Sequence, residues 1–180
     1  LLRLILKLIA PTSGKVTYRW KGNEVKHLNF GYLPQKNTID HRFPITVKEV
    51  ISSGLSSTGK LFHRLTNDEK EKIQQTINLV GLCEKADAGI GEISGGQLQR
   101  ALLGRAIISN PNVLILDEPL SYVDKNFESH LYEIISDLAK HTTIVLVSHE
   151  MTKISQLANR HIIIDGSIHE CHAKHHFVRS

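Results

Sequence analysis

The sequence predicts an α/β fold in which a parallel sheet core carries an inserted helical subdomain. Residues 113–116 form a continuous apolar run, which is typical of a strand buried on both faces in a parallel sheet covered by helices. After residue 111 the expected strands and helices alternate, whereas no long buried strand appears between residues 37 and 110. We therefore assign residues 1–36 and 111–165 to an α/β core, residues 37–110 to a helical subdomain and residues 166–180 to a His-rich tail, all within one domain.

The first half of the chain is expected to be mainly helical. Its helices are predicted at residues 1–10, 46–53, 66–80 and 94–109. Thr66 and Glu69 have the spacing of a capping box at the start of the third helix, and Gly81 stands where that helix should stop. Strands are predicted at residues 15–19 and 30–33, around a turn at residues 21–23.

The second half is expected to follow a parallel α/β pattern. Its strands are predicted at residues 113–116, 142–147 and 161–164, and its helices at residues 125–140 and 151–158. Asp117 and Glu118 follow one of these strands and His149 follows the next. Ligands of open α/β sheets bind beyond the carboxyl ends of the strands, so we expect these side chains at one site.

Composition places the chain among ordinary globular proteins. It has 180 residues, of which 41% are hydrophobic and 22% charged. No apolar run approaches the roughly 20 residues needed to span a bilayer, so a role at a membrane requires a partner. The net charge is +4, but Lys and Arg are scattered, which argues against nucleic-acid binding. The cysteines, Cys83 and Cys171, form no recognisable disulfide framework.

Two segments carry the predicted chemistry. Ser94 can cap a helix whose first turn offers free backbone N–H groups, and Gly95 and Gly96 allow an anion to approach them closely. Asp117 suits a metal ion and Glu118 suits an attacking water. Together these residues indicate nucleotide hydrolysis.

These motifs, taken in order, resemble the nucleotide-binding subunits of ABC transporters, which have a P-loop NTPase-type fold. The resemblance covers nearly the whole chain. Residues 93–97 resemble the family signature, with Ile93 in place of Leu, and residues 114–118 resemble Walker B. Residues 121–124 resemble the D-loop. His149 resembles the switch histidine and Gln35 resembles the Q-loop glutamine. Tyr122 and Val123 depart from the commoner Ala-Leu of the D-loop.

The resemblance implies ATP and Mg²⁺ as cofactors. Asp117 would hold Mg²⁺ through water, and Gln35 would reach Mg²⁺ or water with its amide oxygen. Glu118 would act as general base, and His149 would contact the γ-phosphate. The alternatives are a strand-end cap for Asp117, a solvated acid for Glu118, a loop histidine for His149 and a surface residue for Gln35.

The resemblance also implies that two copies assemble around ATP. Ser94, Gly95, Gly96 and Gln97 would cover the γ-phosphate bound to the opposing protomer, and Asp124 would lie in the loop between the two sites. A homodimer in the ATP-bound state would therefore hold two composite sites.

The expected function is that of a transport ATPase at the cytoplasmic face of the cell membrane. Its partners would be integral membrane permease subunits and, indirectly, a solute-binding protein, with no nucleic acid. Residues 31–36, 43–47 and 119–124 resemble the zinc and manganese uptake branch of the family. The alternatives are a soluble ABC ATPase of translation or DNA repair and a non-hydrolysing ABC-like module.

One family motif is missing from the sequence. The chain begins at Leu1 without a Gly-x-x-x-x-Gly-Lys-Ser/Thr loop, the Walker A motif, and residues 9–16 fail the pattern at Ile9 and Val16. We therefore expect an N-terminally truncated cassette that is inactive alone, because the β- and γ-phosphates lose most of their contacts. The intact protein would be the enzyme.

The tail is a candidate metal site. His169, Cys171, His172, His175 and His176 are ligand types that suit Zn²⁺. A helical tail would place His172, His175 and His176 on one face, and an extended tail would place His169 and Cys171 on one face. The alternative is a frayed, solvated C-terminus, and the spacing matches no closed structural zinc motif.

Overall fold

A computed structural model describes residues 1–35, 40, 42–58, 65–121, 124–149 and 158–172. The chain divides into two compact units, Leu1–Val147 and Ser148–Ser180. None of the described helices is long and apolar enough to cross a membrane.

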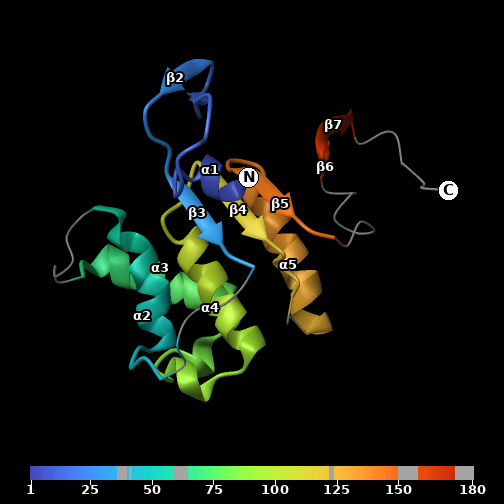
Figure 1. The fold of residues 1–180 in the computed structure, drawn as a ribbon. Helices are drawn as coiled ribbons and strands as arrows, with labels where there is room; N and C mark the ends of the chain where they lie inside the picture. The colour runs from blue at the N-terminus through green and yellow to red at the C-terminus, as the bar shows by residue number, and fades with distance from the viewer. Residues whose placement is uncertain (36–39, 41, 59–64, 122–123, 150–157, 173–180) are drawn as a thin grey trace. The chain divides into compact units, whose positions relative to one another are not determined.

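The first unit is built around a three-stranded parallel sheet. Its strands are β3 (Phe30–Leu33), β4 (Val113–Asp117) and β5 (Thr143–Val147), in the order β3-β4-β5 (Figure 1). In the register, Leu33 lies opposite Leu116, and Asp117 lies opposite Val147. The middle strand β4 is buried along its apolar run, as predicted, with Ile115 fully inaccessible to solvent. The carboxyl ends of all three strands therefore lie at one edge.

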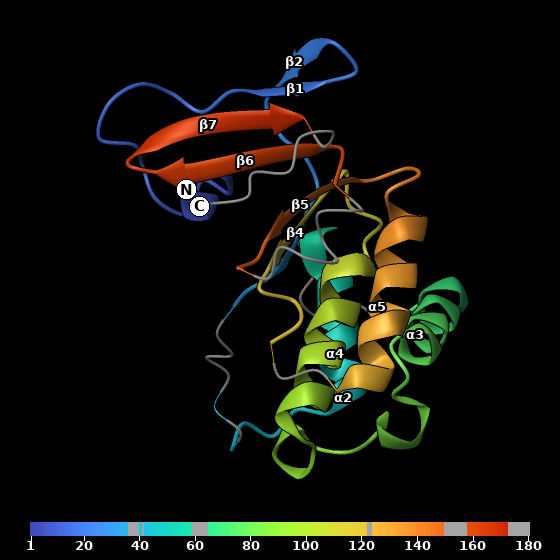
Figure 2. The ribbon, with the colours of Figure 1, turned by 90° about the vertical axis from the view of Figure 1, so that its right-hand side faces the viewer.

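This unit also contains four longer helices. They are α2 (Val47–Ser52), α3 (Asn67–Leu79), α4 (Gly95–Ile107) and α5 (Lys125–Leu138). Short 3-10 turns cover Ser53–Thr58, Cys83–Lys85 and Ile90–Glu92. Helices α4 and α5 lie side by side in both Figures 1 and 2. Helix α4 also packs closely on the sheet, because a Cβ added at Gly31 of β3 would stand 2.1 Å from the carbonyl oxygen of Ala106.

The helix starts agree with the sequence prediction because they depend on local hydrogen bonds. Thr66 Oγ1 accepts from the N–H of Glu69 at 3.2 Å, and Glu69 Oε2 accepts from the N–H of Thr66 at 2.8 Å. Gly81, with φ of +66°, follows the end of α3 as expected. Thr46 and Glu49 form an equivalent capping box before α2.

The predicted helix over residues 1–10 is wrong beyond its first turn. Helix α1 covers only Leu2–Ile5, and Lys7 turns the chain with a left-handed φ of 54°. None of the residues in α1 is buried. A helix this short has few hydrogen bonds, and this one has no buried apolar face to stabilise it.

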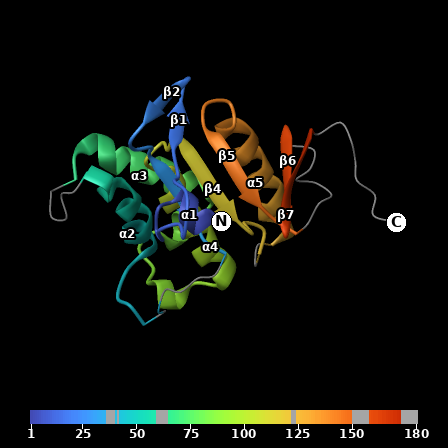
Figure 3. The ribbon, with the colours of Figure 1, turned by 45° about the horizontal axis from the view of Figure 1, so that its top comes forward.

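The first predicted strand is shorter than expected and belongs to a hairpin. Strand β1 (Tyr18–Trp20) pairs antiparallel with β2 (Asn23–Val25), and the two lie side by side in Figure 3. Lys21 and Gly22 join them with φ values of 50° and 82°, which a tight hairpin turn requires. Strand β2 was not predicted, because Asn23-Glu24-Val25 lacks an alternating apolar pattern.

The second unit contains an antiparallel hairpin of β6 (Arg160–Asp165) and β7 (Ser167–His172). The strand predicted at residues 161–164 is thus present, but its expected place in a parallel pattern is wrong. Gly166 alone, with φ of +66°, joins the two strands, and a parallel pairing needs a much longer crossover. Strand β7 also excludes a frayed tail for residues 167–172. Residues 151–157 of the predicted last helix lie outside the described residues.

Candidate functional site

The candidate site is the carboxyl edge of the middle strand. Asp117 is the last residue of β4 and is partly buried, and Glu118 follows it with only 8% of its surface exposed. The N–H of Glu118 donates to the carbonyl oxygen of Val147 at 2.9 Å, which ties this corner to β5. Glu118 has a left-handed φ of 51°, which is unusual for a residue with a side chain. Its burial disagrees with the alternative of a plain solvated acid.

Asp117 lies in an environment that disfavours its negative charge. Burial, followed by the negative charge of Glu118, raises the pKa of Asp117. Burial, followed by the charge of Asp117, likewise raises the pKa of the Tyr32 hydroxyl on β3. Hard carboxylate oxygens are the ligands that Mg²⁺ prefers, so this donor set fits the expected metal ion.

Gln35 lies at the same edge of the sheet. It is two residues beyond the end of β3, and the pairing of Leu33 with Leu116 places this extension beside the end of β4. Gln35 is exposed. The structure therefore brings Gln35 to the edge that carries Asp117 and Glu118, while its contact with a metal ion stays a prediction.

His149 lies in a different compact unit from the acid pair. It comes two residues after the end of β5 in the sequence, as predicted. It belongs to the second unit, Ser148–Ser180, whereas Glu118 belongs to the first. Its role as a switch histidine therefore stays a prediction.

The predicted anion-binding helix start is present at α4. The N–H of Gln97 donates to Ser94 Oγ at 3.2 Å, and the N–H of Ser94 donates to Gln97 Oε1 at 2.9 Å. A Cβ added at Gly95 would meet no heavy atom within 4 Å, and the φ of Gly95 is not positive. The fold therefore does not require glycine at this position, which is the first residue of α4. Close approach of a ligand would account for it.

Asp124 links two helices. Its Oδ1 accepts from the N–H of Phe127 at 2.9 Å and so caps α5. Its Oδ2 forms an ion pair with Arg100 of α4. The N–H of Phe127, followed by the Arg100 guanidinium, lowers the pKa of Asp124. Sequence reasoning missed Arg100, because a pairing across 24 residues leaves no local pattern.

The candidate metal site of the tail falls partly outside the described residues. His169, Cys171 and His172 lie in β7, so this stretch is extended and not helical. Ser167 Oγ and His169 Nε2 are 2.7 Å apart. His175 and His176 lie outside the described residues. No cluster of three or more His, Cys, Asp or Glu side chains suited to a metal ion occurs in the described part of the chain, and the tail site stays a prediction.

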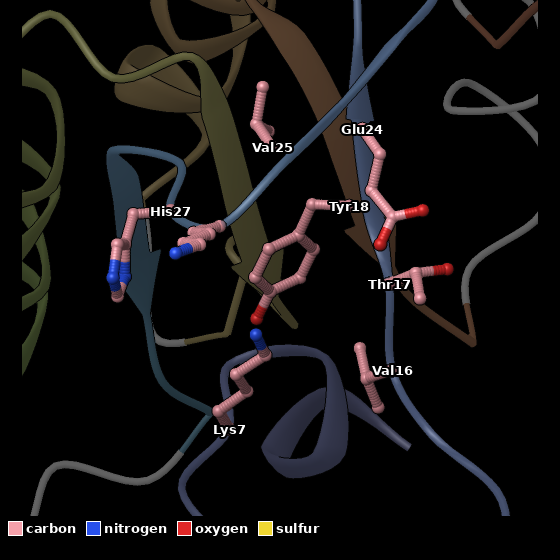
Figure 4. A pocket seen from close by; sticks show the side chains of 8 residues that line it. Lys7, Val16, Thr17, Tyr18, Glu24, Val25 and His27 are labelled. Carbon is pink, nitrogen blue, oxygen red and sulfur yellow. The ribbon is translucent and has the colours of Figure 1, made fainter.

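A cavity of about 590 Å³ lies elsewhere, between the N-terminal segment and the β1–β2 hairpin (Figure 4). Lys7 points toward Tyr18 there, with its Nζ 4.3 Å from the centre of the ring. Glu24 and His27 line the same cavity. None of the predicted nucleotide-site residues lines it, so it is distinct from the acidic edge of the sheet.

Comparison with known proteins identifies the family of the chain. A family model described as ABC transporter matches residues 1–121. The zinc uptake system ATP-binding protein ZurA of Listeria innocua is 36% identical over 181 residues, covering 94% of this chain and 70% of that protein. The high-affinity zinc uptake system ATP-binding protein ZnuC of Bacillus subtilis is 33% identical over 168 residues, covering 92% and 73%.

A solved structure shows the same fold. The dimeric structure of MJ0796, a bacterial ABC transporter cassette, matches with a TM-score of 0.69 at 20% identity. The match covers 82% of this chain and 64% of that one. The family model and the zinc uptake relatives together establish that this chain belongs to the family of ABC transporter ATP-binding proteins.

Proposed function

We propose that the protein carrying this chain hydrolyses ATP to drive metal ion uptake, of zinc or manganese, through a separate membrane permease. The observation that carries the proposal is the acid pair Asp117 and Glu118 at the carboxyl end of the middle strand. Glu118 is buried and its backbone is left-handed. Unfavourable backbone conformations of this kind are concentrated at functional sites.

The two carboxylates have different tasks in this proposal. Bound Mg²⁺ supplies neutralisation of the phosphate charge, and Asp117 would hold it together with Gln35. Glu118 is the general base that takes a proton from the attacking water. His149 orients Glu118 and that water.

The site is completed by a second copy of the chain. Ser94, Gly95, Gly96 and Gln97 offer the N-terminus of α4 to the γ-phosphate held by the partner, where backbone N–H groups favour negative charge. Asp124 lies between the two sites of the dimer. The cassette MJ0796, whose fold this chain shares, is described as dimeric.

The cargo is inferred from the relatives. The names of ZurA and ZnuC describe zinc uptake systems, which supports metal ion import here. The chain would work at the cytoplasmic face of the membrane, bound to permease subunits that receive cargo from a solute-binding protein. Residues 1–180 contain no Walker A motif, so we expect these residues alone not to hydrolyse ATP.

The test uses the complete natural protein with its permease in proteoliposomes. ATP hydrolysis and uptake of radioactive zinc and manganese are measured for wild type and for Glu118→Gln. We expect the substitution to lower hydrolysis by about 10²- to 10⁴-fold, the range for a general base, and to trap an ATP-bound dimer.

Two outcomes would contradict the proposal. Unchanged turnover in Glu118→Gln would remove Glu118 from its role as the base. ATP hydrolysis by the wild type without uptake of zinc or manganese would instead favour a soluble ABC ATPase.

A further inference from the structure

We propose that Arg100 is a positioning residue that locks the Asp124 end of the D-loop to the signature helix α4. This inference rests on the proposed function, because both elements are expected to meet the nucleotide of a second copy. Arg100 itself contacts no residue assigned to Mg²⁺ or to the attacking water among the interactions of the described residues.

The contacts of Arg100 are specific to a guanidinium group. Its side chain is only 18% exposed and forms the ion pair with Asp124 Oδ2. The same guanidinium stacks over the ring of Phe127, 4.2 Å from its centre. Phe127 is buried. Arg100 of α4 therefore contacts the start of α5 through both Asp124 and Phe127.

Asp124 uses both of its carboxylate oxygens in this arrangement. Oδ1 holds the N–H of Phe127, so the carboxylate is fixed to the start of α5. Oδ2 is then directed to Arg100. Asp124 thus cannot shift relative to α4 without breaking the ion pair or the helix cap.

The contacts continue beyond these two helices. His130, one turn further along α5, packs edge-on against Phe127 with the ring centres 5.7 Å apart. Its Nε2 lies 2.7 Å from the carbonyl oxygen of Leu79, the last residue of α3. The cluster of Arg100, Phe127 and His130 therefore joins α4, α5 and α3.

The position of Arg100 along α4 explains why its ion pair with Asp124 matters for the site. Arg100 comes six residues after Ser94 in the sequence, which corresponds to about 9 Å along a rigid helix. Displacement of Asp124 relative to α4 would therefore change its distance from Ser94 at the N-terminus of that helix. Catalytic groups must be held to within about 0.5 Å, so loss of this link should slow turnover without a direct contact to nucleotide.

The experiment measures ATP hydrolysis, ATP-dependent dimer formation and melting temperature of the complete natural protein. The variants are Arg100→Met, Arg100→Lys, Asp124→Asn and the double variant Arg100→Met with Asp124→Asn. Asn caps a helix as well as Asp does, so Asp124→Asn removes the ion pair and keeps the cap. The control is Arg105→Met, at an exposed position of the same helix.

We expect Arg100→Met and Asp124→Asn each to lower kcat and dimer formation about tenfold, with little change in the KM for ATP. The double variant should be no worse than either single variant, because residues in contact do not act additively. Arg100→Lys should recover part of the activity, since it keeps the charge but loses the stacking and the planar fork. Arg105→Met should behave as wild type.

The outcomes separate this inference from the proposed function. If wild type hydrolyses ATP and the Arg100 variants lower only the melting temperature, Arg100 is structural and the inference is overturned. Additive effects in the double variant would overturn it as well. If wild type does not hydrolyse ATP, the proposed function fails, and the positioning role fails with it.

Discussion

At the scale of single residues, Asp117 is placed where its own charge is unfavourable in the protein without ligand. Burial and the neighbouring Glu118 both raise its pKa. Between the ordinary pKa of 3.8 and the raised pKa of the folded protein, the folded chain therefore binds more protons than the unfolded chain. Stability from this residue is present at lower pH and is lost as pH rises through the folded pKa. A bound cation would reverse this loss.

We expect Asp117→Asn to raise the melting temperature at neutral pH in the absence of Mg²⁺. The substitution removes the partly buried charge and its repulsion with Glu118, and it should also weaken stabilisation by Mg²⁺ and ATP. Thermal melts between pH 4 and pH 8, with and without Mg²⁺ and ATP, measure both effects.

The matched control for this prediction is Asp137→Asn. Its hydrogen bond and ion pair with Lys140 lower the pKa of Asp137, so its charge is favourable in the folded protein. Asp137→Asn should therefore not raise the melting temperature. A lower melting temperature for Asp117→Asn at neutral pH would contradict the unfavourable charge at the sheet edge.

Site residues were predictable from the sequence where they belong to a local motif. Asp117 and Glu118 directly follow the apolar run of β4, and Ser94 directly precedes the glycine pair. Arg100 and the left-handed backbone of Glu118 were not predictable, because both depend on neighbours that are distant in the sequence.

At the scale of elements, helices α2, α3 and α4 begin with the same device, a capping box. Ser94 and Gln97 cap α4 as Thr66 and Glu69 cap α3. We expect Ser94→Ala and Thr66→Ala to cost about 1 kcal/mol each in the free energy of unfolding, since each removes one N-cap hydrogen bond. Only Ser94→Ala should also lower ATP hydrolysis, because only α4 faces nucleotide in the proposed dimer.

Chemical denaturation and ATPase assays of the complete protein compare these two variants directly. Thr66→Ala serves as the control for a general loss of helix stability. Equal loss of hydrolysis in both variants would show that Ser94 acts through stability alone.

Helices with a cap and a stop signal were predicted well, and elements without them were not. Helix α3 has both, and its observed bounds of Asn67–Leu79 differ from the prediction by one residue at each end. Helix α1 has no side-chain cap and no buried residue, so apolar composition alone predicted it to be too long. Strand β2 is three residues long and depends on its pairing with β1.

At the scale of the whole molecule, the proposed composite sites make a prediction about mixtures of inactive subunits. Ser94→Arg should block one half of a site and Glu118→Gln the other half. In a mixed dimer both defects fall at one site, and the other site keeps an intact Ser94 and an intact Glu118. Mixing the two inactive proteins should therefore restore part of the hydrolysis.

This complementation is measured by titrating one variant into the other and following phosphate release. The highest activity is expected near equal amounts of the two proteins. Mixtures that stay inactive, while dimers still form, would show that each site is built within one chain.

The parallel sheet and its inserted helices were predictable as a whole, because alternation and buried runs report on them directly. The antiparallel pairing of β6 with β7 was not predictable. Gly166 reverses the chain there, although β6 follows the alternation of strands and helices expected for a parallel sheet. The position of His149 relative to Glu118 depends on how the second unit meets the first, which no local pattern encodes.

The central position of β4 has a consequence for how the protein opens. Its amide hydrogens are bonded between two neighbouring strands, so they can exchange with solvent only after β3 or β5 has separated. We expect them to be among the last in the molecule to exchange. Partial unfolding of elements outside the sheet would then leave the carboxylates of Asp117 and Glu118 in place at the end of β4. These carboxylates would be ready to meet a new nucleotide when the domain folds again.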